Sequence, residues 1–297
     1  MKFGQVNDPG GIDFTLPKDD PATKEILANA KGKGFKVNVG CAKWNKTDLK
    51  NFYPKGTKDE LAYYSQQFNS IELNATFYNM PSPKQVITWR EKTPNNFTFF
   101  PKITNSISHY KRLLDVKTIT EDYCNAVANF EKQLGMVFLQ LHDNFSPKEF
   151  EKLKTFIEQF PKGIPLAVEV RNAKWFEDET VWNDYCKLLE KNKTANIIVD
   201  TAGRRDMVHM RLTSLVAFIR WVGCNDDGID YKRLDDWVDR SKKWQKLGLK
   251  ELHFFVHQNS EQSSPVLASY FIQRLNKTLK LDLKPPALPD GPQGNLF

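Results

Sequence analysis

Charged and amide side chains stand at the ends of several short apolar segments of this chain, where they could be brought together to do chemistry. Side chains alternate between the two faces of a strand, so the apolar parity of each segment is expected outside and the polar parity inside. The inward carboxylates predicted in this way, which suit general acid–base catalysis or a hard metal ion, are Glu72, Glu169 and Asp200. The other inward side chains are expected to be Asn74, Lys102, Gln140, His142, Arg171, Arg220, His257 and Asn259.

This concentration of ionisable groups has two interpretations. Buried charges must be paired, so Glu72 with Lys102, or Glu169 with Arg220, could form ion pairs that only fill the interior. Alternatively, the groups line a ligand site, because clustered ionisable side chains are where shifted pKa values serve catalysis. We favour the ligand site. A divalent metal ion is considered as a cofactor, but no ligand motif such as HExxH supports one, and no metal ligand is assigned.

A basic segment with an aromatic residue follows the third apolar run. His109, Lys111 and Arg112 surround Tyr110, a combination that suits phosphate binding with base stacking, or else forms a solvated loop. Aromatic residues after three other apolar runs could stack on bases or sugars at the rim of a cleft, or close the interior hydrophobically. They are Trp44 and Tyr53, Phe77 and Tyr78, and Trp175 and Phe176.

The elements that must position these residues repeat along the chain. Eight apolar runs alternate with helix-like stretches, and helix starts are marked by pairs such as Ser82-Pro83. The predicted strands are Val37–Cys41, Ser70–Asn74, Phe97–Lys102, Met136–Leu141, Leu166–Val170, Asn196–Asp200, Val216–Trp221 and Leu252–His257. This alternation predicts an α/β fold with a single TIM-type (β/α)8 barrel, irregular between strands six and seven over Thr201–Ser214. The site then lies at the carboxyl ends of the strands.

The 297 residues fit one such barrel with two extensions. We expect an irregular leader over residues 1–35, the barrel over 36–280 and a disordered tail over 281–297, which is rich in Pro and Gly. The tail ends in Gln293-Gly-Asn-Leu296-Phe297, which resembles the peptide motif that binds the bacterial sliding clamp. A flexible tether that presents Gln293, Leu296 and Phe297 would suit a groove on such a partner.

Composition restricts the class of protein. The net charge of +7 favours nucleic acid as a partner, although it also serves solubility alone. No apolar run reaches the about 18 residues of a membrane span, and the start of the chain lacks an apolar signal core, so we expect no membrane association. Four scattered cysteines predict free thiols in the cytoplasm rather than disulfides or a zinc site. Dinucleotide, P-loop and serine-hydrolase motifs are missing from the sequence.

Several of these stretches together resemble one family, the YecE-like proteins that contain domain of unknown function 72. The matching stretches are Gly40–Trp44, Phe52–Pro54, Phe68–Tyr78, Pro101–Lys102, His109–Leu113, Phe138–Leu141, Ala167–Arg171, Trp175–Phe176 and the strand end at Asp200. The resemblance implies a TIM-type barrel and supplies no activity. It also suggests a likeness to endonuclease IV-type barrels, but this chain lacks their histidine-rich metal set. Relatives commonly place paired asparagines after the last strand, where this chain has His257-Gln258-Asn259.

Three functions remain open at this point. The first is a nucleic-acid-binding barrel, such as a repair-associated hydrolase with Glu72 or Glu169 as the base and Lys102, Arg171 and Arg220 holding an anion. The second is an enzyme for a phosphorylated or sugar-like small molecule. The third is a non-catalytic protein associated with a sliding clamp.

Overall fold

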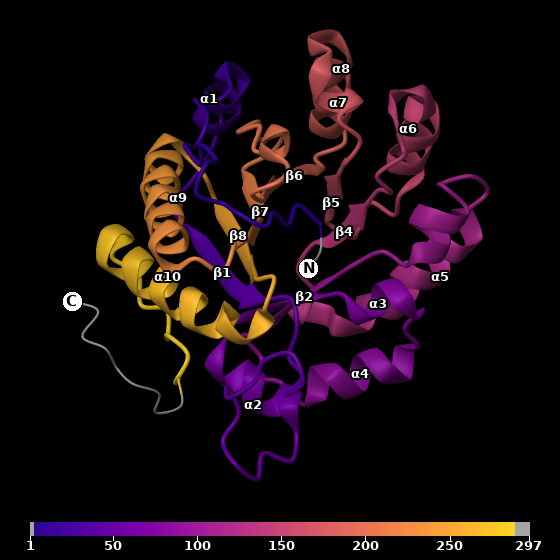
Figure 1. The fold of residues 1–297 in the computed structure, drawn as a ribbon. Helices are drawn as coiled ribbons and strands as arrows, with labels where there is room; N and C mark the ends of the chain where they lie inside the picture. Colours follow the sequence, from indigo (N-terminus) through magenta and orange to yellow (C-terminus); the bar gives the residue numbers. More distant parts are fainter. Residues whose placement is uncertain (1–2, 289–297) are drawn as a thin grey trace.

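The computed structural model describes residues 3–288, and eight parallel strands form its centre (Figure 1). The strands are β1 (Lys36–Cys41), β2 (Ser70–Leu73), β3 (Thr98–Pro101), β4 (Val137–Gln140), β5 (Leu166–Glu169), β6 (Ala195–Asp200), β7 (Val216–Val222) and β8 (Glu251–His257). Six of them form one curled half-barrel sheet in the order β1-β8-β7-β6-β5-β4, and β2 and β3 form a separate pair. All eight predicted strands are confirmed to within two residues at each end.

The two sheets meet at two seams. Between β1 and β2 the side chain of Asn69 makes hydrogen bonds in place of those between the two backbones. It accepts from the amide of Val39 at 3.0 Å and donates to the carbonyl of Val37 at 2.8 Å. Gly40 allows this approach, since a Cβ there would collide with the carbonyl oxygen of Ser70. Between β3 and β4 only isolated bridges occur among the described residues, one of them from Lys102 to Phe138. The strand pairing thus establishes the half-barrel and not the predicted complete eight-stranded ladder.

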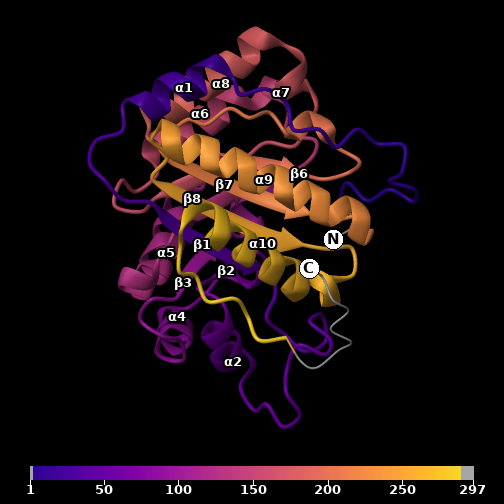
Figure 2. The same cartoon turned by 90° about the vertical axis from the view of Figure 1, so that its left-hand side faces the viewer.

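The helices lie outside the strands (Figure 1), and Figure 2 shows α9 and α10 alongside β7 and β8. The α-helices are α1 (Pro21–Ala28), α2 (Glu60–Gln67), α3 (Ala75–Tyr78), α4 (Pro83–Glu91), α5 (Lys117–Val127), α6 (Phe150–Gln159), α7 (Lys174–Glu177), α8 (Glu179–Lys191), α9 (Asp227–Leu247) and α10 (Ser264–Leu279). A π-helical turn covers Ser106–Tyr110, and short 3-10 helices cover Ala128–Gln133, Pro147–Glu149, Arg205–Met207 and Glu261–Ser263. The predicted irregular region between β6 and β7 is confirmed, since only the turn Arg205–Met207 occurs there.

An aromatic layer fills the interior below the strand ends. The rings of Phe100 on β3, Phe218 on β7 and Phe255 on β8 contact one another, with centroids 4.9–5.8 Å apart. These strands are not all neighbours in a sheet, so their rings meet only because the side chains point inward. Ile197 and Val199 of β6 belong to the same buried cluster. The larger core lies between the outer face of the strands and the helices.

Both extensions are more ordered than the sequence suggests. The leader contains helix α1, capped by the side chain of Asp20, so the expectation of an irregular segment over 1–35 is wrong for that part. Asp19 binds Arg240, Lys243 and the indole nitrogen of Trp244 on α9, which fixes the leader against the barrel wall.

The first residues of the predicted disordered tail are likewise bonded. The backbone amide of Ala287 donates to Gln67 Oε1 at 2.9 Å, and Lys284 donates to the carbonyl of Gln66 at 3.0 Å. Residues 281–288 therefore contact the rest of the chain, although none of them lies in a helix or strand. Gln293, Leu296 and Phe297 lie outside the described residues. Within the described part of the chain, no helix combines the length and apolar character needed to cross a membrane.

Candidate functional site at the strand ends

A single arginine joins the two carboxylates that the sequence analysis placed in the interior. The guanidinium of Arg220 contacts both oxygens of Glu72, at 2.7 and 2.9 Å, and one oxygen of Glu169 at 2.6 Å. All three side chains are at most 1% exposed. They come from β7, β2 and β5, so this ion triad connects the half-barrel sheet to the two-stranded sheet. The expected pair of Glu169 with Arg220 is confirmed, whereas Glu72 pairs with Arg220 rather than Lys102.

Gln140 on β4 connects further basic groups to this triad. Its Oε1 accepts from Lys102 Nζ at 2.9 Å, from Arg171 at 2.8 Å and from Arg220 at 3.2 Å. Arg171 also contacts Glu169 at 2.5 Å, and His257 Nε2 lies 2.9 Å from Glu72. We call the joined residues the strand-end cluster, which comprises Glu72, Lys102, Gln140, Glu169, Arg171, Arg220 and His257. The predicted convergence of these seven side chains is thus present in the structure.

The ion pairs set the protonation of both carboxylates. Burial by itself raises the pKa of Glu72, but the charges of Arg220 and His257 outweigh burial and hold that pKa well below its usual range. Burial acts in the same way on Glu169, and Arg171 with Arg220 brings its pKa to about 2. Neither carboxylate is poised to accept a proton at neutral pH, because a general base works best with a pKa near the working pH.

Lys102 differs from the other cations of the cluster. Its ammonium nitrogen lies 4.0 Å from the ring centre of Phe77, and no carboxylate of the described residues lies within ion-pair distance of it. Burial first, and then the nearby charges of Arg220 and Arg171, lower the pKa of Lys102 to about 7. A substantial fraction of this amine is therefore neutral at physiological pH.

Asp200 does not join the cluster, and its inward placement is wrong. It points toward the helices, where it accepts from Arg233 at 2.9 Å and from the indole of Trp237 at 2.7 Å, and it also pairs with Arg205. Because Ile197 and Val199 occupy the interior, the remaining parity of β6 must face outward. The charge of Arg233 more than offsets the effect of burial and lowers the pKa of this carboxyl, as expected of a structural ion pair.

Smaller polar groups border the strand-end cluster. Asn74 donates to Glu72 at 2.8 Å. The His109 ring packs between Phe77 and His142, and burial lowers its pKa to about 4. Asn259 follows β8 with a buried side-chain oxygen that has no hydrogen-bond partner among the described residues.

The aromatic and basic rim is only partly where it was expected. Tyr78 and Tyr110 are 70% and 76% exposed, as a stacking surface requires. Trp175 is fully buried and donates to the carbonyl of Phe145 at 2.8 Å, so its expected place on a rim is wrong. Trp44 packs edge-on against Trp89 of α4. Lys111 is exposed, while Arg112 is occupied by ion pairing with Glu149.

Two contacts were not predicted from the sequence. Phe77, which was expected at the rim with Tyr78, instead forms one side of the Lys102 environment. Phe3 of the leader stacks its ring 3.9 Å from the guanidinium carbon of Arg171. Nothing in the sequence indicates that a residue 168 positions away from Arg171 would reach the strand ends.

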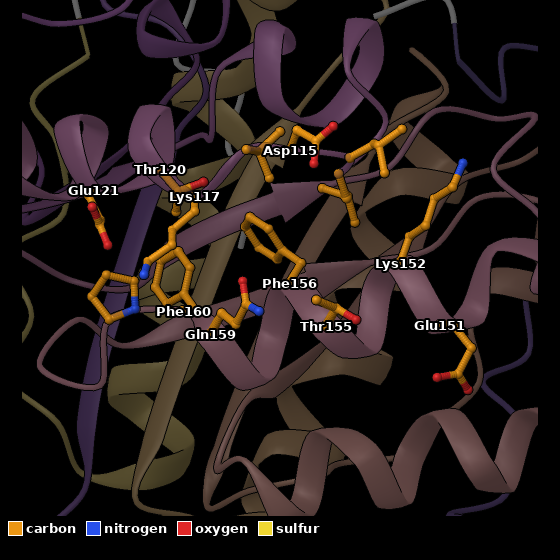
Figure 3. A pocket seen from close by; sticks show the side chains of 14 residues that line it. Asp115, Lys117, Thr120, Glu121, Glu151, Lys152, Thr155, Phe156, Gln159 and Phe160 are labelled. Carbon is orange, nitrogen blue, oxygen red and sulfur yellow. The ribbon is translucent and has the colours of Figure 1, made fainter.

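A groove of about 380 Å³ lies elsewhere, between α5 and α6 (Figure 3). Phe156 and Phe160 contribute apolar surface to it, and none of its lining residues belongs to the strand-end cluster. Among the described residues, no group of three or more His, Cys, Asp or Glu side chains is arranged to hold a metal ion. The described side chains thus offer no ligand set for a divalent metal ion.

Comparisons with known proteins agree on a family. The model of a family described as protein of unknown function DUF72 matches residues 38–292. The YecE protein of Escherichia coli K12, of family UPF0759, is 27% identical over 285 residues, covering 88% of this chain and all of that protein. A solved DUF72 family structure from Enterococcus faecalis V583 has a TM-score of 0.65 at 18% identity, covering 84% of this chain and 99% of that one. Another from Thermotoga maritima MSB8 has a TM-score of 0.61 at 24% identity, covering 83% and 100%. At these identities the solved structures support the fold alone.

Proposed function

The chain belongs to the DUF72 family, whose name supplies no reaction, and from its own residues we propose that the strand-end cluster is an enzyme active site for a small anionic substrate. The observation that carries the proposal is the buried Lys102, which has no carboxylate of the described residues within ion-pair distance. The buried carboxylates Glu72 and Glu169 are bound by Arg220 and Arg171, and Arg171 also lies 3.6 Å from the exposed Asp143. An anion with a phosphate or carboxylate group would balance the remaining charge and contact Lys102 or Arg171.

The same contacts indicate different roles for the charged residues of the site. Glu72 and Glu169 are occupied by Arg220, and their low pKa values support a role in holding that guanidinium rather than in removing a proton. This weighs against hydrolysis with either glutamate as base. Lys102 and Arg171 lie on the side of the cluster that borders the partly exposed His109 and Asp143. These two basic residues are therefore the proposed substrate contacts.

A thermal-shift titration tests the proposal. Inorganic phosphate, glycerol 3-phosphate and glyoxylate are each added to wild-type protein and to Arg171→Gln, with Arg274→Gln as a surface control. A ligand at a hundred times its Kd stabilises the native state by about 2.7 kcal/mol, so wild type and the control should both unfold at a higher temperature. The Arg171→Gln variant should respond weakly. Equal responses in all three proteins, or none in any of them, would contradict an anion site at the strand ends.

A second candidate is binding of single-stranded nucleic acid. The exposed rings of Tyr78 and Tyr110, beside the exposed Lys111, favour it, and so does the net charge of +7. Fluorescence anisotropy with labelled single-stranded and duplex DNA should then give an affinity that falls steeply with salt and drops in Tyr78→Ala with Tyr110→Ala. Negligible binding at low salt would remove this candidate.

Three further proposals concern the setting of the site. The two sheets together form a distorted eight-stranded barrel, supported by the contacts across both seams. The described cysteines are free thiols, which supports a reducing compartment, the cytoplasm. Gln293, Leu296 and Phe297 bind a bacterial sliding clamp, and deletion of residues 293–297 should abolish that binding if the tail is responsible.

A further inference from the structure

Lys102 is held as an isolated, oriented amine rather than as one half of an ion pair. Its Nζ donates to the amide oxygen of Gln140 at 2.9 Å and lies 4.0 Å from the ring centre of Phe77. The carboxylates nearest in the cluster are already bound by Arg220 and Arg171. An amide acceptor fixes the direction of the amine without stabilising its charged form as a carboxylate would.

We infer that Lys102 is a nucleophile that forms an imine with the carbonyl carbon of a small anionic aldehyde or ketone. The inference rests on the proposed function, because the substrate must first bind as an anion beside Arg171. It adds the substrate class, a carbonyl compound carrying a carboxylate or phosphate, and it gives Lys102 a covalent role.

The chemistry balances without a further reagent. The lone pair of neutral Nζ attacks the carbonyl carbon and forms a C–N bond, giving a carbinolamine. Both hydrogens of the amine then leave with the former carbonyl oxygen as water, and a C=N bond remains. The amine needs its lone pair for the first step, and the pKa of about 7 provides it. At pH 7 the neutral fraction exceeds that of an ordinary exposed lysine by on the order of a thousandfold.

The surroundings of Lys102 also limit what can reach it. Its side chain is only 7% exposed, between Phe77 and the amide of Gln140. Such limited access excludes a folded macromolecule from Lys102 and restricts its reactant to a compact molecule. Arg171 would hold the carboxylate through its Nη1, whose neighbour in the structure is the exposed Asp143 at 3.6 Å, because its Nε and Nη2 are bound by Glu169 and Gln140.

Reductive trapping tests the inference on the full-length protein. Glyoxylate, an aldehyde that carries a carboxylate, is added with cyanoborohydride, and the carboxymethylated lysines are located by peptide mass spectrometry. Wild type is compared with Lys102→Met and with Lys187→Met, which removes an exposed lysine of α8. We expect Lys102 to be labelled at least about tenfold faster than the exposed lysines at pH 7, despite its limited access. This fast labelling should be absent only from Lys102→Met.

The pH profile and the anion titration separate the possible failures. Labelling of Lys102 should level off above a pH of about 7, while labelling of exposed lysines keeps rising. If Lys102 of the wild-type protein is labelled no faster than its exposed lysines, the inference is overturned. This result does not depend on whether the Lys102→Met variant folds. If glyoxylate stabilises wild type in the thermal-shift titration and Lys102 stays unmodified, the imine fails and the anion site stands. If glyoxylate neither stabilises the wild-type protein nor modifies Lys102, the anion site and the imine both fail.

Discussion

At the scale of single residues, Arg220 has the largest structural consequences. Its guanidinium is the shared partner of two carboxylates that lie 97 positions apart and on different sheets. A buried ion pair adds little stability by itself, because desolvation offsets the attraction, but removing one partner leaves the other charge uncompensated. The same residue therefore serves the fold and the site, and the two roles can be separated experimentally.

Replacing Arg220 should be costly. The Arg220→Met variant leaves Glu72 and Glu169 buried without the cation that they share, and we expect a loss of about 3–5 kcal/mol in the free energy of unfolding. Urea denaturation followed by circular dichroism measures this loss. Arg274→Met is the control, since its pair with Asp235 is more than a third exposed and should cost less than about 1 kcal/mol. Equal losses in the two variants would contradict the central role of Arg220.

Lys102 should leave a signature in the dependence of stability on pH. Its pKa is about 7 in the folded chain and about 10.4 in an unfolded one, so between these values the unfolded state binds more protons. Stability contributed by this group therefore rises with pH from about 7 to about 10 and is constant below that window.

The difference in unfolding free energy between wild type and Lys102→Met isolates this contribution. It should increase in favour of wild type across the window. A flat difference for Lys102→Met would show that its pKa is not lowered in the native state.

At the scale of elements, β6 shows that the alternation of side chains along a strand does not always identify its inward face. In the strands that form the cluster the inward parity was assigned correctly, although β4, β7 and β8 also contain three or more apolar residues in a row. In β6 three apolar residues occur in a row, Ile197, Ile198 and Val199, so both faces are apolar and the rule does not decide. An inward Asp200 was expected because Ile197 and Val199 were assigned to the outward face, whereas the structure places these two residues in the interior and the Asp200 carboxylate under α9.

The expectation of an irregular leader was partly wrong for another reason. The pair Asp20-Pro21 caps and begins α1 and is a usual helix start, which the expectation of an irregular leader did not include. The contacts of Phe3 and Asp19 could not be predicted in any case, because they join segments far apart in the sequence. Local patterns identify elements, but they do not indicate which distant element lies against them.

Asp200 provides a test at this scale. The Asp200→Asn variant keeps an acceptor for Trp237 but removes the charge that Arg233 and Arg205 share, so we expect a loss of about 3 kcal/mol in unfolding free energy. Glyoxylate trapping at Lys102, measured well below the unfolding temperature, should be unchanged. The Arg171→Gln variant should give the opposite pattern, with weak anion binding and a smaller loss of stability. Lost trapping in a folded Asp200→Asn protein would restore Asp200 to the site.

At the scale of the whole molecule, two sheets are joined by side chains rather than by a continuous ladder. The ion triad of Glu72, Arg220 and Glu169 crosses the interior, and Asn69 crosses the seam between β1 and β2. The site is therefore assembled from both sheets, with Glu72 and Lys102 on the side of β2 and β3 and the others on the half-barrel. A change in how the sheets meet would alter the site directly.

The seam should be the point where the molecule opens first. Asn69→Ala removes the two hydrogen bonds that join the Asn69 side chain to the backbone of Val37 and Val39 in β1, so we expect a loss of about 1–3 kcal/mol and faster amide exchange in β2 and β3 than in β6 to β8. Asn129→Ala is the matched control, since Asn129 also makes two side-chain hydrogen bonds to backbone, but within a single exposed turn. Native-state hydrogen exchange with mass spectrometry resolves the two regions. If exchange in Asn69→Ala increases uniformly across all eight strands, the sheets unfold as one unit and the seam is not a boundary of stability.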